Sequence, residues 1–117
     1  MKPIIALTMF LLTLPIIVQA DTLTSLEGET RDLLAQGQVM DRSRLAAGAC
    51  GRKMRTLQPQ VRQLQSRIDA LPNPKSDTFY LGVAANYLLL CVSCHEKLGP
   101  EHCSEAASYL RKMDSKR

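Results

Sequence analysis

Three of the four cysteines in the chain lie in one short stretch, and two of them belong to a motif that could carry chemistry. Residues 91–95 read Cys-Val-Ser-Cys-His, which is the attachment motif of c-type haem. In that chemistry Cys91 and Cys94 form thioether bonds to the macrocycle, and His95 becomes an axial ligand of the iron. The other interpretation is that the cysteines are disulfide partners, with His95 as a solvated residue near a helix end.

The haem motif lies near the C-terminal end of a long predicted helix, and this placement resembles the class II c-type cytochromes, four-helix bundles of the cytochrome c′ kind. The resemblance covers the motif and the helical pattern, and it implies electron transfer or ligand binding through one covalent haem. Cys103, however, has no role in the cytochrome pattern. The aromatic side chains that could enclose a macrocycle are few: Phe79, Tyr80, Tyr87 and Tyr109. We therefore expect no cofactor and keep haem c as the alternative.

Two further cysteine chemistries are disfavoured by position and spacing. Reactive CxxC pairs sit at helix N-termini, where the helix dipole stabilises a thiolate, whereas Cys91 and Cys94 lie in the last turns of a predicted helix. The spacing around Cys50 is unlike that of zinc-binding motifs. The sequence also has no glycine-rich phosphate loop, nucleophile elbow or cluster of carboxylates. We therefore expect no enzyme activity and no metal site.

The first 20 residues have the pattern of a secretory signal peptide. Lys2 precedes an apolar run over residues 4–18, and Val18-Gln19-Ala20 is a small-x-small cleavage site. The pattern predicts a periplasmic or secreted protein whose single domain covers residues 21–117, without a transmembrane segment in the mature chain. Four cysteines in an exported chain of this size predict two disulfides.

The mature chain is rich in Leu, Ala, Gln, Arg and Glu and has no Trp, which favours helices over strands. The sequence predicts an all-α fold, a small disulfide-stapled bundle of four to five helices arranged as antiparallel hairpins. The predicted helices cover residues 24–36, 41–71, 77–98 and 100–113. Thr24, Asp41 and Asp77 are the predicted capping residues, and Gly99-Pro100 is the predicted turn before the last helix.

The strongest periodic signal is a heptad repeat in the second predicted helix. Its members are Cys50, Met54, Leu57, Val61, Leu64, Ile68 and Leu71. Pro59 interrupts the helix without changing its phase, so a kinked helix or two helices meeting near Gln58 would both keep the repeat facing inward. The third helix has a still wider apolar face, so we expect it to be the most buried. That face comprises Tyr80, Leu81, Ala84, Tyr87, Leu88, Leu90, Cys91, Cys94 and Leu98.

All four cysteines fall on predicted inner faces, so their pairing depends on the turns. When the chain is folded about the predicted turns, Cys50 and Cys103 both lie closest to Cys94, and only one of them can bond to it. By this count, the cysteines of one possible pairing are as far from being level with each other as those of the other pairing. We prefer Cys94–Cys103 with Cys50–Cys91, because Gly99-Pro100 fixes the short hairpin while the proline-rich loop lets the long one adjust.

The second helix is also the most basic part of the chain. Between positions 42 and 67 the sequence has seven basic residues and no acidic one. Helical spacing places Arg52, Arg55 and Arg62 on one stripe opposite the heptad repeat. This stripe predicts a docking surface for an acidic protein or an anionic lipid surface, and the alternative is a solvated face without a partner. Export and the lack of interleaved aromatic residues argue against nucleic acid.

These patterns favour a small exported, non-enzymatic binding protein, inhibitor-like or regulatory, that is held together by two disulfides. The alternative is a small c-type haem protein that carries its cofactor at residues 91–95.

Overall fold

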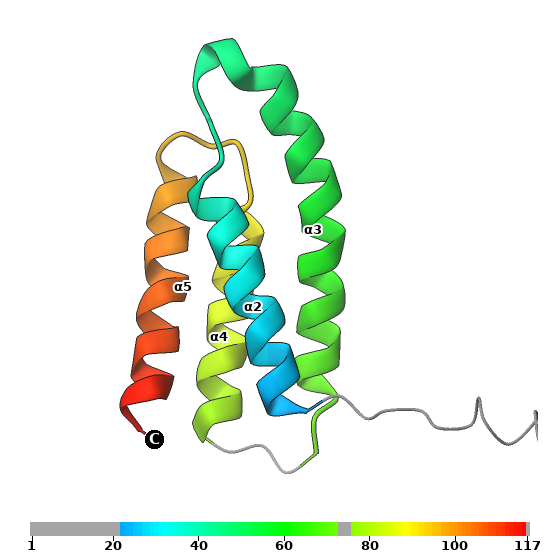
Figure 1. Cartoon of the computed structure of the whole chain (residues 1–117), viewed down its shortest axis with the longest axis vertical. Helices are drawn as coiled ribbons and strands as arrows, with labels where there is room; N and C mark the ends of the chain where they lie inside the picture. The colour runs from blue at the N-terminus through cyan, green and yellow to red at the C-terminus, as the bar shows by residue number, and fades with distance from the viewer. Residues whose placement is uncertain (1–21, 73–75, 117) are drawn as a thin grey trace, which may run out of the picture.

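The computed structural model describes residues 22–72 and 76–116, and all regular structure within them is helical. The elements are α2 (Leu23–Gln38), the short 3-10 helix η2 (Arg44–Ala46), α3 (Ala47–Asp69), α4 (Ser76–Cys91) and α5 (Leu98–Ser115). The α-helices run alternately up and down, so that neighbours along the chain are antiparallel (Figure 1). The predicted all-α, disulfide-stapled bundle is thus confirmed. The predicted signal, residues 1–20, lies outside the described residues.

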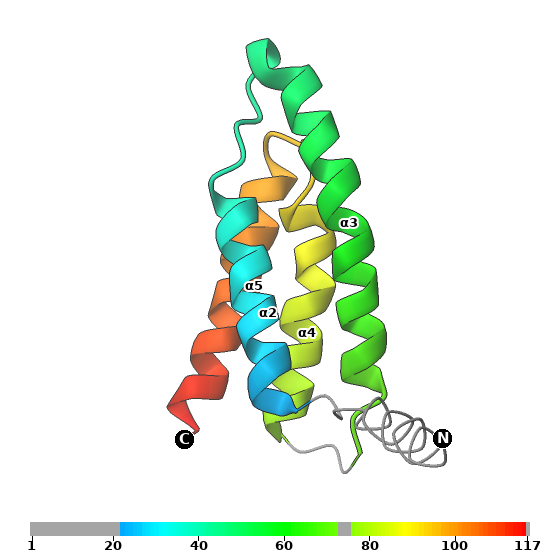
Figure 2. The same ribbon diagram turned by 45° about the vertical axis from the view of Figure 1, so that its right-hand side comes forward.

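The central helix of the bundle is α4, which packs against α2, α3 and α5. Helix α2 also contacts α3 and α5, whereas α3 and α5 do not contact each other within the described residues. Helix α4 is therefore flanked by α3 and α5 and covered by α2 on one side (Figures 1 and 2). The N-terminal end of α3, together with η2, projects beyond the other helices.

The heptad repeat of α3 faces the core, as predicted. Leu57, Val61, Leu64 and Ile68 are all buried, and each fully buried aliphatic side chain contributes ~1.5–3 kcal/mol to folding. The other helices supply the rest of the apolar core: Leu26, Leu33, Leu34, Leu81, Ala84, Ala85, Leu88, Ala106, Leu110 and Met113. Thr30 is buried with them, and its hydroxyl donates to the Leu26 carbonyl at 2.8 Å, so its burial leaves no unpaired donor.

Helix α3 continues through Pro59 as a single element, which decides between the kinked and split alternatives in favour of one helix. Pro59 lies on the exposed side of α3. A proline has no backbone N–H to donate to the carbonyl four residues earlier, and on the exposed side water can bond to that carbonyl instead.

Two predicted helix starts are wrong by a few residues. Helix α2 is capped by Thr22, whose hydroxyl oxygen accepts from the Ser25 N–H at 3.1 Å, and not by Thr24. Asp41 does not cap a helix, because its carboxylate accepts from the Ser43 N–H at 2.9 Å and closes a local turn. That hydrogen bond lowers the pKa of Asp41. The chain then makes the turn of η2 before α3 begins at Ala47.

The predicted boundary between the third and fourth helices is also wrong. Helix α4 ends at Cys91 instead of Leu98, residues 92–97 form the turn, and Gly99 and Pro100 lie inside the first turn of α5. The ring Nδ1 of His95 accepts from the Leu98 N–H at 3.0 Å and from the Lys97 N–H at 3.3 Å, which supports the early start of α5. Pro100 fits there because N–H groups of a first helical turn lack helical partners.

Candidate functional site

The structure has two disulfides, as predicted, but the preferred pairing of the four cysteines is wrong. Cys50 is bonded to Cys94 and Cys91 to Cys103, with Cα–Cα distances of 5.9 and 4.5 Å. The reason is the position of the turn. Because α4 ends at Cys91, this residue lies across the hairpin from Cys103 on α5, while Cys94 lies in the turn and bonds to Cys50 on α3.

This geometry separates the parts of the Cys-Val-Ser-Cys-His motif. The Cys91 sulfur bonds toward α5 and the Cys94 sulfur toward α3, so the two do not share one helical face. Cys91 is fully buried, and His95 is exposed with Nδ1 engaged by backbone N–H groups. Attachment of haem would require both disulfides to be opened and the turn to be rebuilt.

Arg42 is the most highly connected polar side chain near the disulfides. Its Nε donates to the Ser93 carbonyl at 2.7 Å, and Nη2 donates to the carbonyls of Gly37, at 3.0 Å, and Cys91. Nη2 also lies 3.9 Å from the Cys103 sulfur. One guanidinium thus joins the ends of α2 and α4 to the turn that leads into α5.

The position of Arg42 matches the charge of its surroundings. Carbonyl groups at helix C-termini carry partial negative charge, and Arg42 bonds to such groups at the ends of both α2 and α4. Burial lowers the pKa of Arg42, because the charged form loses contact with water. Gly99 lies directly against the guanidinium, where a Cβ atom would be only 2.8 Å from Cζ. Arg42 was predicted as one member of a surface charge cluster, and its actual contacts are internal.

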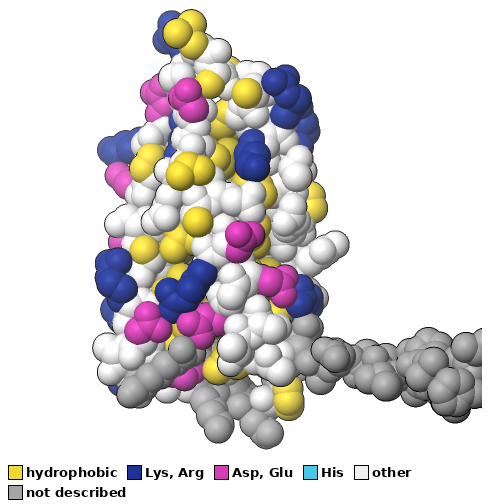
Figure 3. Space-filling view, viewed as in Figure 1, with side chains coloured by type: hydrophobic (Ala, Val, Ile, Leu, Met, Phe, Trp, Pro, Cys, Tyr) yellow, Lys and Arg dark blue, Asp and Glu magenta, His cyan; other side chains and the backbone are white. Residues whose placement is uncertain are grey.

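Arg67 is the second of the seven basic residues between positions 42 and 67, after Arg42, that binds a group within the bundle. Arg67 forms a two-pronged ion pair with Glu29, with N–O distances of 2.6 and 2.7 Å. The remaining five are exposed, namely Arg44, Arg52, Lys53, Arg55 and Arg62. None of these five forms a salt bridge among the described residues. Figure 3 shows Lys and Arg side chains over the upper part of α3 without Asp or Glu among them.

The sequence interpretation missed a second surface, the face of α4 turned away from α2. Residues 78–94 contain no charged side chain, and the wide apolar face of this helix predicted that it would be the most buried one. Phe79 is 64% exposed and Leu90 is 39% exposed, so the prediction that Leu90 belongs to the core is wrong. Phe79, Val83, Asn86 and Leu90 recur at steps of four, three and four, which places them on one side of the helix. The signal that marks this face is the absence of charge from a helix that is only partly covered.

Aromatic rings extend this face onto α5. Tyr87 stacks on Tyr109 with ring centroids 5.8 Å apart and contacts His102 at 5.4 Å. Tyr80 lies between Phe79 and Tyr109, at 5.7 and 6.4 Å. All four aromatic residues of the described chain are therefore in one continuous cluster along α4 and α5.

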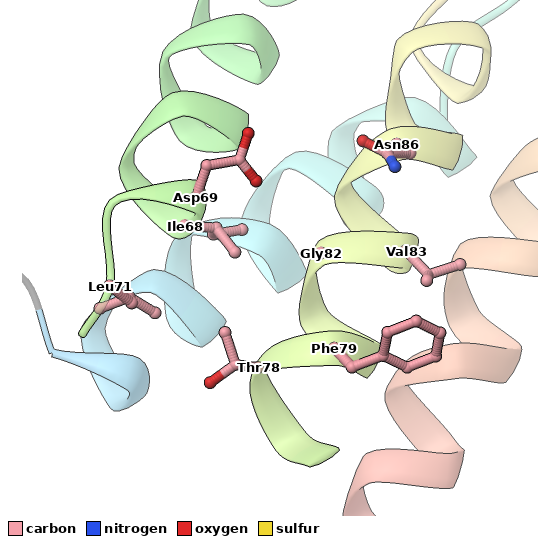
Figure 4. A pocket seen from close by; sticks show the side chains of 8 residues that line it. All are labelled: Ile68, Asp69, Leu71, Thr78, Phe79, Gly82, Val83 and Asn86. Atoms are coloured by element: carbon pink, nitrogen blue, oxygen red, sulfur yellow. The ribbon is translucent and has the colours of Figure 1, made fainter. Parts of the chain in front are cut away.

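A groove of about 370 Å³ borders the same face on the α3 side. Ile68 and Asp69 of α3 form one wall, and Phe79, Gly82 and Val83 of α4 form the other. Figure 4 shows Ile68 and Asp69 on the α3 side turned toward Gly82, with α2 behind them, while Phe79 and Val83 point toward the α5 side of α4. The side chain at Gly82 is absent, which leaves space beside Ile68.

Within residues 22–72 and 76–116, no three His, Cys, Asp or Glu side chains are grouped so that they could hold a metal ion. The described helices include none that is long and apolar enough to cross a membrane. Comparison with known proteins found no matching family model, no matching curated protein and no matching solved structure. Function is therefore inferred from the physical properties of the two surfaces.

Proposed function

We propose that this is a small exported, non-enzymatic binding protein, inhibitor-like or regulatory, that holds an acidic partner protein on the outer face of α3. The observation that supports it is that Arg52 and Arg55 are exposed on a helix without acidic neighbours and form no salt bridge among the described residues. Guanidinium groups bind carboxylates through two parallel hydrogen bonds, which makes a helical pair of arginines selective for acidic side chains.

The rest of the structure supports presentation of that face. The bond between Cys50 and Cys94 ties the projecting part of α3 to the turn before α5, so Arg52 and Arg55 lie on a constrained helix. A constrained surface loses less conformational entropy on binding than a flexible one. Nearby positive charges also raise the rate of association with an acidic partner.

The disulfides also bear on the compartment and on the haem alternative. Two disulfides in a small chain are typical of an oxidising compartment, in agreement with the proposed export to the periplasm or beyond. Because the sulfurs of Cys91 and Cys94 bond to different helices, the geometry supports structural cysteines over covalent haem.

The test is a charge reversal, Arg52→Glu with Arg55→Glu. The matched control is Arg111→Glu with Lys116→Glu, which makes the same change of net charge on exposed positions of α5 and its end. Circular dichroism establishes that both variants fold. We expect the wild type and the control to retain acidic proteins from a periplasmic extract at about 50 mM salt and to release them near 500 mM, where charge interactions are screened.

The α3 variant should lose these proteins at both salt concentrations. If it keeps the same proteins with the same salt response, the α3 face is a solvated surface and the proposal is wrong. Vesicles of anionic phospholipid are added as a competitor. If wild-type protein binds the vesicles and no acidic protein, the partner of the face is a lipid surface.

A further inference from the structure

We propose that the uncovered face of α4 binds a second copy of this chain, forming a two-fold dimer in which the α4 helices pack antiparallel. This goes beyond the proposed binding function and uses the face of α4, where only Arg62 of the predicted arginine stripe lies at the edge. The face consists of Phe79, Val83, Asn86 and Leu90, with the groove toward α3 on one side and the aromatic cluster toward α5 on the other.

The composition of this face requires a cover. A helix without charged side chains over most of its length is stable in water when its apolar sides are buried, and here the bundle buries only part of α4. Exposed aromatic residues next to aliphatic ones are the typical core of a protein–protein interface. Phe79 alone leaves 64% of its surface in water.

The face is complementary to itself, which favours a second copy over an unrelated partner. A two-fold axis that lies in the interface, perpendicular to α4 and level with the point between Ala84 and Ala85, is equidistant from Phe79 and Leu90, and also from Val83 and Asn86. It therefore places Phe79 of each copy opposite Leu90 of the other. Two-fold interfaces require such reciprocal contacts. Leu90 of the second copy then lies at the groove beside Phe79, where Gly82 leaves space.

The exposed charges of α3 obey the same symmetry. The Gln65 amide donates to the Asn86 side chain at 3.0 Å, and a Cβ atom at Gly82 would lie 3.8 Å from the Ile68 side chain. These two contacts align α3 with α4 and place the proposed axis level with about positions 65–67. Arg62 and Asp69 lie on either side of that level, and both are exposed without a salt bridge among the described residues. An antiparallel dimer places α3 beside α3 of the second copy, so each Arg62 faces an Asp69.

The α5 side repeats this arrangement independently. Tyr87 contacts both His102 and Tyr109, which places the axis level with about position 108 of α5. Glu105 and Lys112 lie on either side of that level and on the same side of the helix as His102 and Tyr109. Each Glu105 therefore faces a Lys112 of the second copy. The ammonium of Lys112 is already held toward this face, 4.3 Å from the centroid of the Tyr109 ring.

The first experiment measures the molar mass of the mature protein by light scattering after size-exclusion chromatography, at about 10 to 100 μM. We expect a dimer for the wild type. Phe79→Asp should give a monomer, because it places a charge in the apolar contact between Phe79 and Leu90 of the second copy, from which water is excluded. Leu45→Asp is the matched control, because Leu45 is fully exposed on η2 and far from α4, and this variant should stay dimeric. A monomeric wild type at these concentrations would overturn the proposal.

A charge exchange tests the orientation. Arg62→Asp alone should weaken the dimer, because each new aspartate faces an Asp69. Asp69→Arg alone should also weaken it, because each new arginine faces an Arg62. We expect each substitution to raise the dissociation constant of the dimer by roughly tenfold or more. A mixture of the two single variants should form a heterodimer, since every facing pair is again of opposite charge. If the mixture associates no better than either variant alone, the antiparallel arrangement is wrong. Dimerisation that both Phe79→Asp and the charge variants leave intact would place the interface on another face.

Discussion

At the scale of single residues, Arg42 determines how one end of the bundle is closed. Its guanidinium satisfies carbonyls at the C-terminal ends of α2 and α4 and in the turn that follows α4. Buried or half-buried carbonyls without a donor cost free energy, so this one side chain stabilises three segments together. It also lies beside the Cys91–Cys103 bond, which connects the end of α4 to α5.

The structure predicts that Arg42→Ala destabilises the fold more than the same change at a neighbouring arginine. Removing the guanidinium leaves the Gly37, Cys91 and Ser93 carbonyls without this donor, which should lower the free energy of unfolding by about 2–3 kcal/mol. Arg44→Ala, at an exposed position, should change it by less than about 0.5 kcal/mol. Urea unfolding followed by circular dichroism measures both. Equal midpoints would mean that water replaces Arg42 at these carbonyls without loss.

At the scale of elements, α2 has two glycines in very different surroundings. A Cβ atom at Gly37 would lie against the Cys91 sulfur, 3.1 Å from the Cys91 carbonyl oxygen and 3.3 Å from the Cys103 sulfur. A Cβ atom at Gly28 would meet nothing within 4 Å. Helix α2 therefore packs on the Cys91–Cys103 disulfide through a residue that has no side chain.

We predict opposite effects for alanine at these two positions of α2. Gly28→Ala should raise the free energy of unfolding by ~0.5–1 kcal/mol, because alanine has the better helix propensity and the site is open. Gly37→Ala gains the same helix propensity, but the added methyl group pushes α2 away from the disulfide. Overpacking of this kind costs ~1–3 kcal/mol, so the net effect is a lower free energy of unfolding. Urea unfolding at one protein concentration compares the two. A stabilised Gly37→Ala would show that the contact can open without cost.

The helices also differ in how well they could be predicted from the sequence. The heptad repeat of α3 was predicted correctly because burial of Leu57, Val61 and Leu64 repeats with the period of the helix itself. The end of α4 could not be predicted in this way, because the carbonyl of Cys91 bonds to Arg42, which is 49 positions away in the sequence. The cysteine pairing failed for the same reason, since it depends on where that helix ends.

The two candidate surfaces also differ in whether they depend on one helix or on contacts between helices. The arginine stripe depends only on spacing along one helix, so the exposure of Arg52 and Arg55 was predictable from the sequence. The α4 face depends on which helices cover α4. Absence of charge is typical of a helix that is buried within its own chain and also of one that is buried against another chain, and only the arrangement of α3 and α5 separates the two cases.

At the scale of the whole molecule, two disulfides hold three of the four described α-helices at the same end of the bundle. Cys50 connects α3 to the 92–97 turn, and Cys91 connects α4 to α5. At the opposite end the described helices are held by packing and by ion pairs such as those of Arg67 with Glu29 and Arg31 with Asp114. The fold is thus constrained covalently where Arg42 lies and non-covalently elsewhere.

We predict that partial reduction of the oxidised protein opens its disulfides in a fixed order. Cys94 is partly exposed, whereas Cys91 and Cys103 are buried, so Cys50 and Cys94 should be the first pair to react with an alkylating reagent. Mass spectrometry of the trapped species identifies which cysteines are labelled together and also shows whether a haem group is attached. Joint labelling of Cys94 and Cys103, or a mass increase of one haem, would contradict the pairing described here.

The native bonds interleave along the chain, since the first cysteine is bonded to the third and the second to the fourth. A polypeptide that emerges from its N-terminus presents Cys50 first to an oxidising enzyme, then Cys91, three residues later Cys94, and last Cys103. Oxidation in order of emergence would join Cys50 to Cys91, a pair that is absent from the folded protein. Maturation should therefore require thiol–disulfide exchange, and hence a disulfide isomerase, and alkylation during early oxidation should trap the Cys50–Cys91 species.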